Sequence, residues 1–328
     1  MLAPLQTLSC TAAALCLALG CSGASGSGPR PPAVPPEDPD PLSDFAAAAA
    51  ILPPAPIAIA WADIDALRQG PVSPLLERLE GNIPAAEDSS ATFLSENLDV
   101  IHRIAGGIYV TLTGPAFFIV IEGDMATETL FSDVKDWARE KGATASPCKV
   151  RGHPGLRIGN TVLVDAGDGL FINGPEGLTG RTLDLMDRKT TGSAMNAQVA
   201  YLARTTIQDD AALVVAGIAP PSITDWFHEK NLPSIVGSRF LLAVQAPGPI
   251  NFRLGLLPGK PIKPIWFAQE VNTFLVRAAK DPSVVDVGMS EWVEGLHVEL
   301  LNKGIVVRGS IEGDRLLEIV DSAGGGSW

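Results

Sequence analysis

The sequence predicts an α+β fold, built from two tandem repeats of antiparallel β-hairpins with helices packed on one face of the strands. Three observations predict it. Pairs of β-rich segments are joined by short turns, amphipathic helical segments lie between these pairs, and the order of segments recurs in the second half of the chain. Consecutive hairpins favour antiparallel sheets, whereas a doubly wound parallel fold would alternate single strands with helices.

The first repeat is expected over residues 54–207. Ile and Trp side chains alternate with Ala over residues 57–61, which predicts a strand. The pair Ser73–Pro74 has the N-cap and first-turn residues that begin a helix, so a short helix is expected there.

The remaining elements of the first repeat follow from periodicity. Apolar residues from 93 to 105 recur on one helical face and Gly106 fits the position after a helix, so we expect a helix with His102 on its flank. Hairpins are predicted over 106–124 and 161–174, the latter turning at Asp165–Gly169, and helices over 127–142, 178–186 and 195–206.

The second repeat is expected over residues 208–323 and has the same order of elements. We predict a strand and short helix over 212–230, hairpins over 238–259 and 296–309, a helix over 264–281 and a closing segment over 312–320. The two long helices can be aligned so that Val134 pairs with Val271 and Trp137 with Phe274. Duplication explains this match, and chance recurrence of common hairpin–helix patterns is the alternative.

Residues 1–20 have the layout of an export signal and end just before Cys21. Their apolar core, residues 10–20, is too short to span a bilayer. The segment Ala18-Leu19-Gly20-Cys21 resembles the lipobox of bacterial lipoproteins. The resemblance implies that Cys21 becomes residue one, carries acyl chains such as palmitate and anchors the protein in the cell envelope. Ser22 then favours the outer membrane, on its periplasmic or surface face. An ordinary cleaved signal peptide, with Cys21 incidental, is the alternative.

Residues 21–53 are expected to form a disordered tether between the anchor and the body. The segment is rich in Gly and Ser as far as Gly28 and rich in Pro beyond it. The run of alanines over 44–52 predicts a short helix at the end of the tether. Residues 324–328 are expected to be a C-terminal tail.

Charge and cysteine content exclude several classes of function. The net charge is −13 and the sequence has no run of Lys or Arg, which argues against nucleic-acid binding and against peripheral binding to anionic lipid. Cys10 and Cys16 lie in the export signal and Cys21 is the expected lipid attachment site, so Cys148 has no partner for an internal disulfide. We expect Cys148 to be a buried small hydrophobic residue; the alternative is a reactive thiol.

The motifs of catalysis and metal binding are not matched. Residues 174–182 resemble a phosphate-binding loop, but Arg181 stands where the lysine is required, so a strand-to-helix turn is expected. Asp165 and Asp168 fit a turn better than a Ca²⁺ loop. The histidines are scattered, with His153 in a turn and His297 in a strand, and no G-x-S-x-G segment is present. We therefore expect no catalytic residue, no cofactor and no metal.

These observations favour an exported, lipid-anchored, non-catalytic protein that acts as an envelope-associated binding or structural module. Its partners would be the membrane, through the lipid on Cys21, and an envelope protein or an apolar ligand. The apolar runs 117–121 and 240–244 are expected to be strands buried on both faces. Alternatively they line a groove, which would make the protein a carrier of an apolar ligand or peptide between the repeats. An unmarked hydrolase is the third hypothesis.

Overall fold

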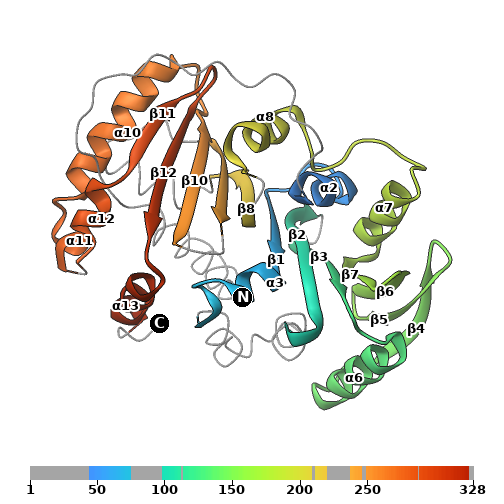
Figure 1. Ribbon diagram of the computed structural model, residues 1–328. Coiled ribbons are helices and arrows are strands. Elements are labelled where there is room, and N and C mark those ends of the chain that lie inside the picture. The colour runs from blue at the N-terminus through green and yellow to red at the C-terminus, as the bar shows by residue number, and fades with distance from the viewer. Residues whose placement is uncertain are drawn as a thin grey trace. The chain divides into compact units, whose positions relative to one another are not determined.

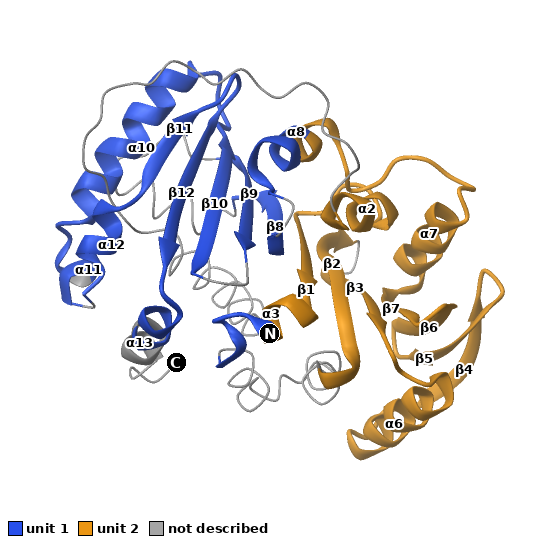
Figure 2. Ribbon diagram, viewed as in Figure 1, with its two compact units in different colours: residues 1–40, 69–74, 201–328 blue, residues 41–68, 75–200 orange. Residues whose placement is uncertain are grey.

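The computed structural model describes residues 44–74, 98–111, 114–208, 211–219, 237–245, 249–286 and 288–324 (Figure 1). The chain divides into two compact units, which are described separately below (Figure 2). Unit 2 comprises residues 41–68 and 75–200, and unit 1 comprises residues 1–40, 69–74 and 201–328. The expected signal peptide, the tether as far as residue 43 and the last four residues of the expected tail lie outside the described residues.

Unit 2 has a seven-stranded antiparallel sheet with strand order β1-β2-β3-β7-β6-β5-β4. Its strands are β1 (Ala58–Asp63), β2 (Ile101–Thr111), β3 (Gly114–Gly123), β4 (Ala145–Val150), β5 (His153–Ile158), β6 (Thr161–Gly167) and β7 (Leu170–Pro175). Its helices are α2 (Asp44–Ile51), α3 (Ile64–Gln69), the 3-10 turn η1 (Leu98–Val100), α6 (Thr127–Glu140), α7 (Glu176–Met186) and the start of α8 (Ala197–Thr206).

Unit 1 has a five-stranded antiparallel sheet with strand order β11-β12-β10-β9-β8. Its strands are β8 (Ala211–Ile218), β9 (Arg239–Gln245), β10 (Ile250–Leu257), β11 (His297–Leu300) and β12 (Ile305–Ile311). Its helices are the end of α8, α10 (Pro264–Ala278), α11 (Pro282–Asp286), α12 (Ser290–Glu294) and α13 (Gly313–Gly324).

The α+β class and the antiparallel hairpins are therefore confirmed. The predicted hairpins correspond to β2–β3, β6–β7, β9–β10 and β11–β12, and the predicted long helices to α6 and α10. Gly142 follows the C-cap of α6 with φ +70°, and Pro264 occupies the first turn of α10, as these residues favour helix ends and helix starts.

The strand order is the same in both units once the β4–β5 hairpin is set aside. The series β1, β2, β3, β7, β6 in unit 2 matches β8, β9, β10, β12, β11 in unit 1. In each unit the long helix follows the central hairpin: α6 follows β2–β3, and α10 follows β9–β10. The two helices contact strands that do not correspond in this match. Helix α6 packs on β4 and β5, whereas α10 packs on β11 and β12.

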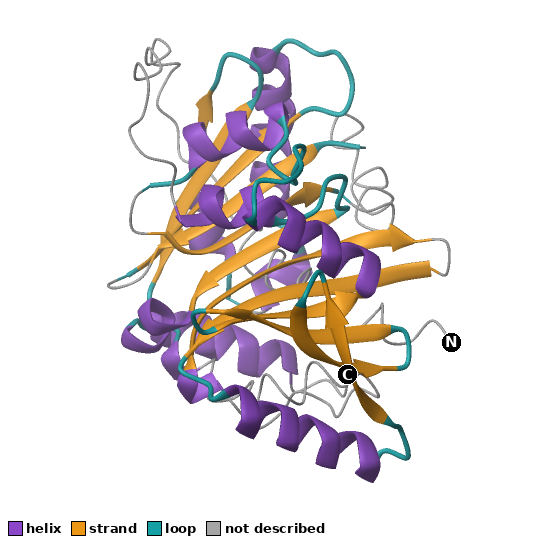
Figure 3. Ribbon diagram, turned by 90° about the vertical axis from the view of Figure 1, so that its right-hand side faces the viewer, coloured by secondary structure: helices purple, strands orange, loops and turns teal. Residues whose placement is uncertain are grey.

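Helices do not cover one face only, so that part of the prediction is wrong. Consecutive residues of the inner strands are buried, for example Val162, Leu163 and Val164 in β6 and 241–244 in β9. Because successive side chains of a strand point to opposite faces, both faces of these strands are covered. In unit 2, α6 and α7 lie on the two sides of β5 and β6, and helices are visible on both sides of the strands in the second view (Figures 1 and 3).

The helix predicted over residues 93–105 is also wrong from residue 98 onward. Residues 98–100 form η1, and residues 101–105 begin strand β2. Gly106 lies inside this strand, where a Cβ atom would come within 2.6 Å of the Phe118 carbonyl oxygen. A β-bulge after Ile101 breaks the alternation of apolar residues, which explains why the segment resembled a helix.

The folded part of unit 2 begins before Pro54, the start predicted for the body. The predicted short helix is present as α2, and its Phe45 and Ala49 side chains are at most 2% exposed. Leu52 is also buried, and the Tyr109 hydroxyl donates a hydrogen bond to the Pro53 carbonyl oxygen at 3.1 Å. Residues 44–53 are therefore part of the packed unit, because their apolar side chains contribute to its core.

Candidate functional site

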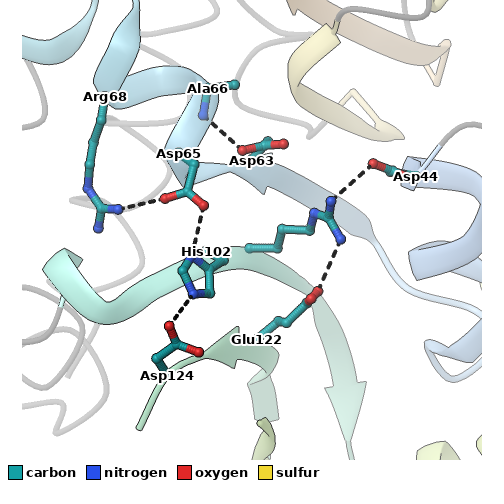
Figure 4. A network of polar contacts seen from close by, with 9 residues as sticks. Asp44, Asp63, Asp65, Ala66, Arg68, His102, Glu122 and Asp124 are labelled. Carbon is teal, nitrogen blue, oxygen red and sulfur yellow. Dashed lines mark hydrogen bonds and ion pairs between the residues drawn. The ribbon is translucent and has the colours of Figure 1, made fainter. Parts of the chain in front are cut away.

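The most developed polar cluster of the described residues lies in unit 2, where α3, the start of β2 and the end of β3 meet (Figure 4). Asp63 ends β1 and caps α3: its Oδ1 accepts a hydrogen bond from the Ala66 amide at 2.9 Å. This cap sets the start of α3 and places Asp65 in its first turn. On the adjacent strand, the β-bulge makes His102 the extra residue between the Ile101–Gly123 and Arg103–Glu122 pairs.

His102 is held between two carboxylates. Its Nδ1 lies 2.7 Å from Oδ2 of Asp65, and its Nε2 lies 3.2 Å from Oδ2 of Asp124. The other oxygen of Asp65 accepts a hydrogen bond from Arg68 at 2.9 Å (Figure 4). The His102 side chain is 38% exposed, so water reaches the cluster.

This geometry favours the charged imidazolium. A carboxylate only accepts hydrogen bonds, and an imidazole ring donates from both nitrogens only when it is protonated. The hydrogen bond to Asp65, followed by the one to Asp124, raises the pKa of His102 above its ordinary value. Both ring nitrogens are engaged, so the ring presents neither a free base nor a free metal ligand.

Arg103 forms a second group of ion pairs beside His102. Its guanidinium lies 3.5 Å from Glu122 of β3 and 3.7 Å from Asp44 at the start of α2. Adjacent residues of one strand thus join its sheet to two helices: His102 to α3, and Arg103 to α2. These contacts position elements and involve no nucleophilic side chain.

The sequence did not reveal this cluster. His102 was expected on the flank of a helix, and its carboxylate partners were not singled out. Asp65 and Asp124 come from separate elements, and no spacing motif relates them to His102. The β-bulge that brings the three together depends on the pairing of β2 with β3, which the sequence pattern does not encode locally.

The residues that the sequence did single out have structural roles. Asp165 Oδ1 accepts the Gly167 amide at 2.8 Å and its Oδ2 accepts the Thr127 hydroxyl at 2.7 Å, while Asp168 adopts φ +52° in the turn. These contacts confirm that Asp165 and Asp168 serve a turn. Arg181 donates to the carbonyl oxygens of Thr191 and Gly192, and the strand-to-helix turn before it is confirmed.

Cys148, His153 and His297 lie in strands of the described part of the chain and outside the His102 cluster. Cys148 is half-buried in β4, and burial raises the pKa of its thiol, which lowers its nucleophilicity at neutral pH. His153 begins β5; the turn lies one step earlier, at Arg151 and Gly152, both with positive φ. His297 lies in strand β11, as predicted, and its side chain is exposed there, whereas Cys21 and His228 lie outside the described residues.

The apolar runs belong to the core of their units. In β3, Phe118, Val120 and Ile121 are at most 4% exposed, and β9 is buried from residue 241 to residue 244. A groove of about 610 Å³ lies instead along α10, where apolar and polar side chains are mixed. Its lining includes Ile262, Trp266, Glu270, Phe274 and Arg277.

Within the described ranges, no three His, Cys, Asp or Glu side chains are grouped so that they could hold a metal ion. In the same part of the chain, no helix has both the length and the apolar character needed to cross a bilayer.

Comparison with known proteins identifies the fold and no family. No family model and no curated protein sequence matches the chain. A solved structure, crystal form III of TP0453, superposes with a TM-score of 0.51 at 10% identity, covering 84% of this chain and 97% of that one. Crystal form I of TP0453 gives a TM-score of 0.49 at 11% identity, with 84% and 96% covered. At such low identity the likeness concerns the fold alone.

Proposed function

We propose that this protein is exported, anchored in the bacterial envelope through a lipid on Cys21, and acts there as a non-catalytic binding or structural module. The leader supports the anchor: an apolar segment too short to span a bilayer ends at Cys21, and a Gly-, Ser- and Pro-rich stretch follows. Several acyl chains on one cysteine would hold the body firmly, because each buried methylene contributes about 0.8 kcal/mol.

The observation that carries the non-catalytic part of the proposal is the engagement of both nitrogens of His102. In a hydrolytic triad one imidazole nitrogen faces a carboxylate and the other faces the nucleophile. Here Asp65 and Asp124 occupy both positions at 2.7 and 3.2 Å. The arrangement suits a cation that joins structural elements, and it does not suit a general base.

We also propose that the body arose by tandem duplication. The order of five strands that the two units share supports this proposal, as does the position of each long helix after the central hairpin. The aligned residues Val134 and Val271 are both buried, at 8% and 4% exposed, whereas Trp137 is half-buried and its counterpart Phe274 is buried. On this view the β4–β5 hairpin is an insertion specific to the first copy, and it provides the surface on which α6 packs.

Metabolic labelling with an alkyne fatty acid tests the anchor. The wild-type protein should incorporate the label and fractionate with membranes, and the Cys21→Ser variant should do neither. Cys148→Ser is the matched control and should behave as wild type, because Cys148 lies in the folded body. Labelling of Cys21→Ser at the wild-type level would overturn the proposal.

A further inference from the structure

α3 is a short helix whose position depends on its contacts with neighbouring elements. It has six residues, Ile64–Gln69, and helices of this length are not stable without external contacts. Ile64 and Leu67 supply buried apolar contacts. Arg68 is the last residue of unit 2 before the chain continues as residues 69–74 of unit 1, so α3 lies where the chain leaves unit 2.

Among the residues that the structure describes, one ion pair of the Asp65 cluster joins α3 to the β2–β3 hairpin. Arg68 and Asp65 both belong to α3, so their 2.9 Å ion pair is a contact within the helix. Asp63 is engaged with the Ala66 amide at the start of the same helix. The contact between Asp65 and His102 is the one that crosses to the strand, and Asp124 at the end of β3 holds the far side of the imidazole ring.

We propose that Asp65, His102 and Asp124 form a proton-dependent clasp, which fastens α3 to the β2–β3 hairpin when the imidazole is charged and loosens it when the imidazole is neutral. The inference goes beyond the proposed function and does not depend on the lipid anchor.

The chemistry of the three side chains sets the direction of the switch. A neutral imidazole donates one hydrogen bond, so on losing its proton His102 turns a lone pair toward one of the two carboxylates. Because the pKa of His102 is raised, the clasp is fully formed below the ordinary histidine pKa of about 6.5 and is lost as the pH rises through the higher pKa of the folded protein.

The neighbouring charges do not substitute for the imidazolium. Arg68 stays bound to Asp65 within α3, and Arg103 is engaged by Glu122 and Asp44 on the other side of the bulge. When His102 is neutral, its ring keeps a hydrogen bond to one of the two carboxylates, Asp65 or Asp124, and turns a lone pair toward the other. The hydrogen-bonded link across the ring is then broken while the links within each element remain.

Titration of His102 by NMR in the purified full-length protein is the first test. The chain has four histidines, and loss of one resonance in His102→Gln assigns the signal. Its midpoint should lie above about 6.5 and should fall in both Asp65→Asn and Asp124→Asn. Asp136→Asn is the matched control, since Asp136 pairs with Arg139 on the exposed side of α6 and should leave the midpoint unchanged.

Amide hydrogen exchange in α3 is the second test, and it measures whether the helix opens more often when His102 loses its proton. Protection factors of residues 66–68 should drop several-fold between a pH below the His102 midpoint and a pH above it. His102→Gln should show the lower protection at both pH values. A midpoint at or below 6.5, or a raised midpoint without a step in α3 protection, would overturn the clasp. If His102→Gln does not fold, the comparison is made between the wild type and Asp124→Asn. The pH-dependent drop in α3 protection should be present in the wild type and smaller in Asp124→Asn.

Discussion

The close packing of α8 on β10 predicts that substitutions at Gly255 and Thr206 have coupled effects on stability. At Gly255 of β10, an added Cβ atom would lie 2.2 Å from Oγ1 of Thr206 and 3.0 Å from Cδ2 of Leu202. Separations below 3.0 Å are essentially never seen for real Cβ atoms, so in Gly255→Ala either the Thr206 side chain must leave its rotamer or α8 and β10 must move apart. Overpacking of this kind costs about 1–3 kcal/mol of the free energy of unfolding.

The second substitution, Thr206→Ala, removes the clashing oxygen. The Thr206 hydroxyl is fully buried and has no hydrogen-bond partner among the described residues, so its removal costs little. Thr206→Ala also removes the buried Cγ2 methyl group, so the single variant should lose about 1 kcal/mol of the free energy of unfolding. In the double variant the nearest atom of residue 206 is its Cβ, 3.3 Å from the new methyl group. Most of the cost of Gly255→Ala should therefore disappear.

Urea unfolding of the four proteins, followed by tryptophan fluorescence, measures the coupling between the two positions. We expect a favourable interaction energy of about 1–2 kcal/mol, which is within the range for residues in contact. Gly177→Ala in α7 is the matched control: its Cβ meets nothing within 4 Å, so stability should rise by up to about 1 kcal/mol. Additivity of Gly255→Ala and Thr206→Ala within about 0.5 kcal/mol would refute the packing of α8 on β10.

Two further predictions concern stability and are read from the same urea unfolding curves. Phe274→Ala should cost about 3–5 kcal/mol because the ring is 8% exposed, and Trp137→Ala should cost less because Trp137 is only half-buried; equal costs would contradict the difference in packing between α6 and α10. Ala55→Gly should stabilise the protein by up to about 1 kcal/mol, because Ala55 has φ +62° and precedes a proline; a loss of stability would show that the left-handed backbone at this residue is not strained.

Hairpins with strong local signals could be predicted from the sequence, and the proline-containing β4–β5 hairpin could not. Alternating β-rich runs around Gly-containing turns located β6–β7 and β11–β12 correctly. The β4–β5 hairpin was missed because Pro147 and Pro154 indicate loops, whereas the structure places both prolines in the strands nearest the sheet edge. The two short helices α11 and α12 carry too few residues to show a period.

The candidate site could not be predicted because it depends on strand pairing. A single β-bulge turns His102 toward Asp65 and Asp124, and a bulge is set by the partner strand as much as by its own residues. The extent of the tether was misjudged for a similar reason. The alanine-rich α2 has little amphipathic pattern, and its burial follows from contacts with α7, β1 and β2.

The central claim, a lipid anchor at Cys21, is tested most directly by the intact mass of the protein extracted from membranes. The account predicts a mature chain that begins at Cys21 and carries the added mass of its acyl chains, with the N-terminal peptide recovered only in modified form. An unmodified chain whose first residue is any other position would contradict it.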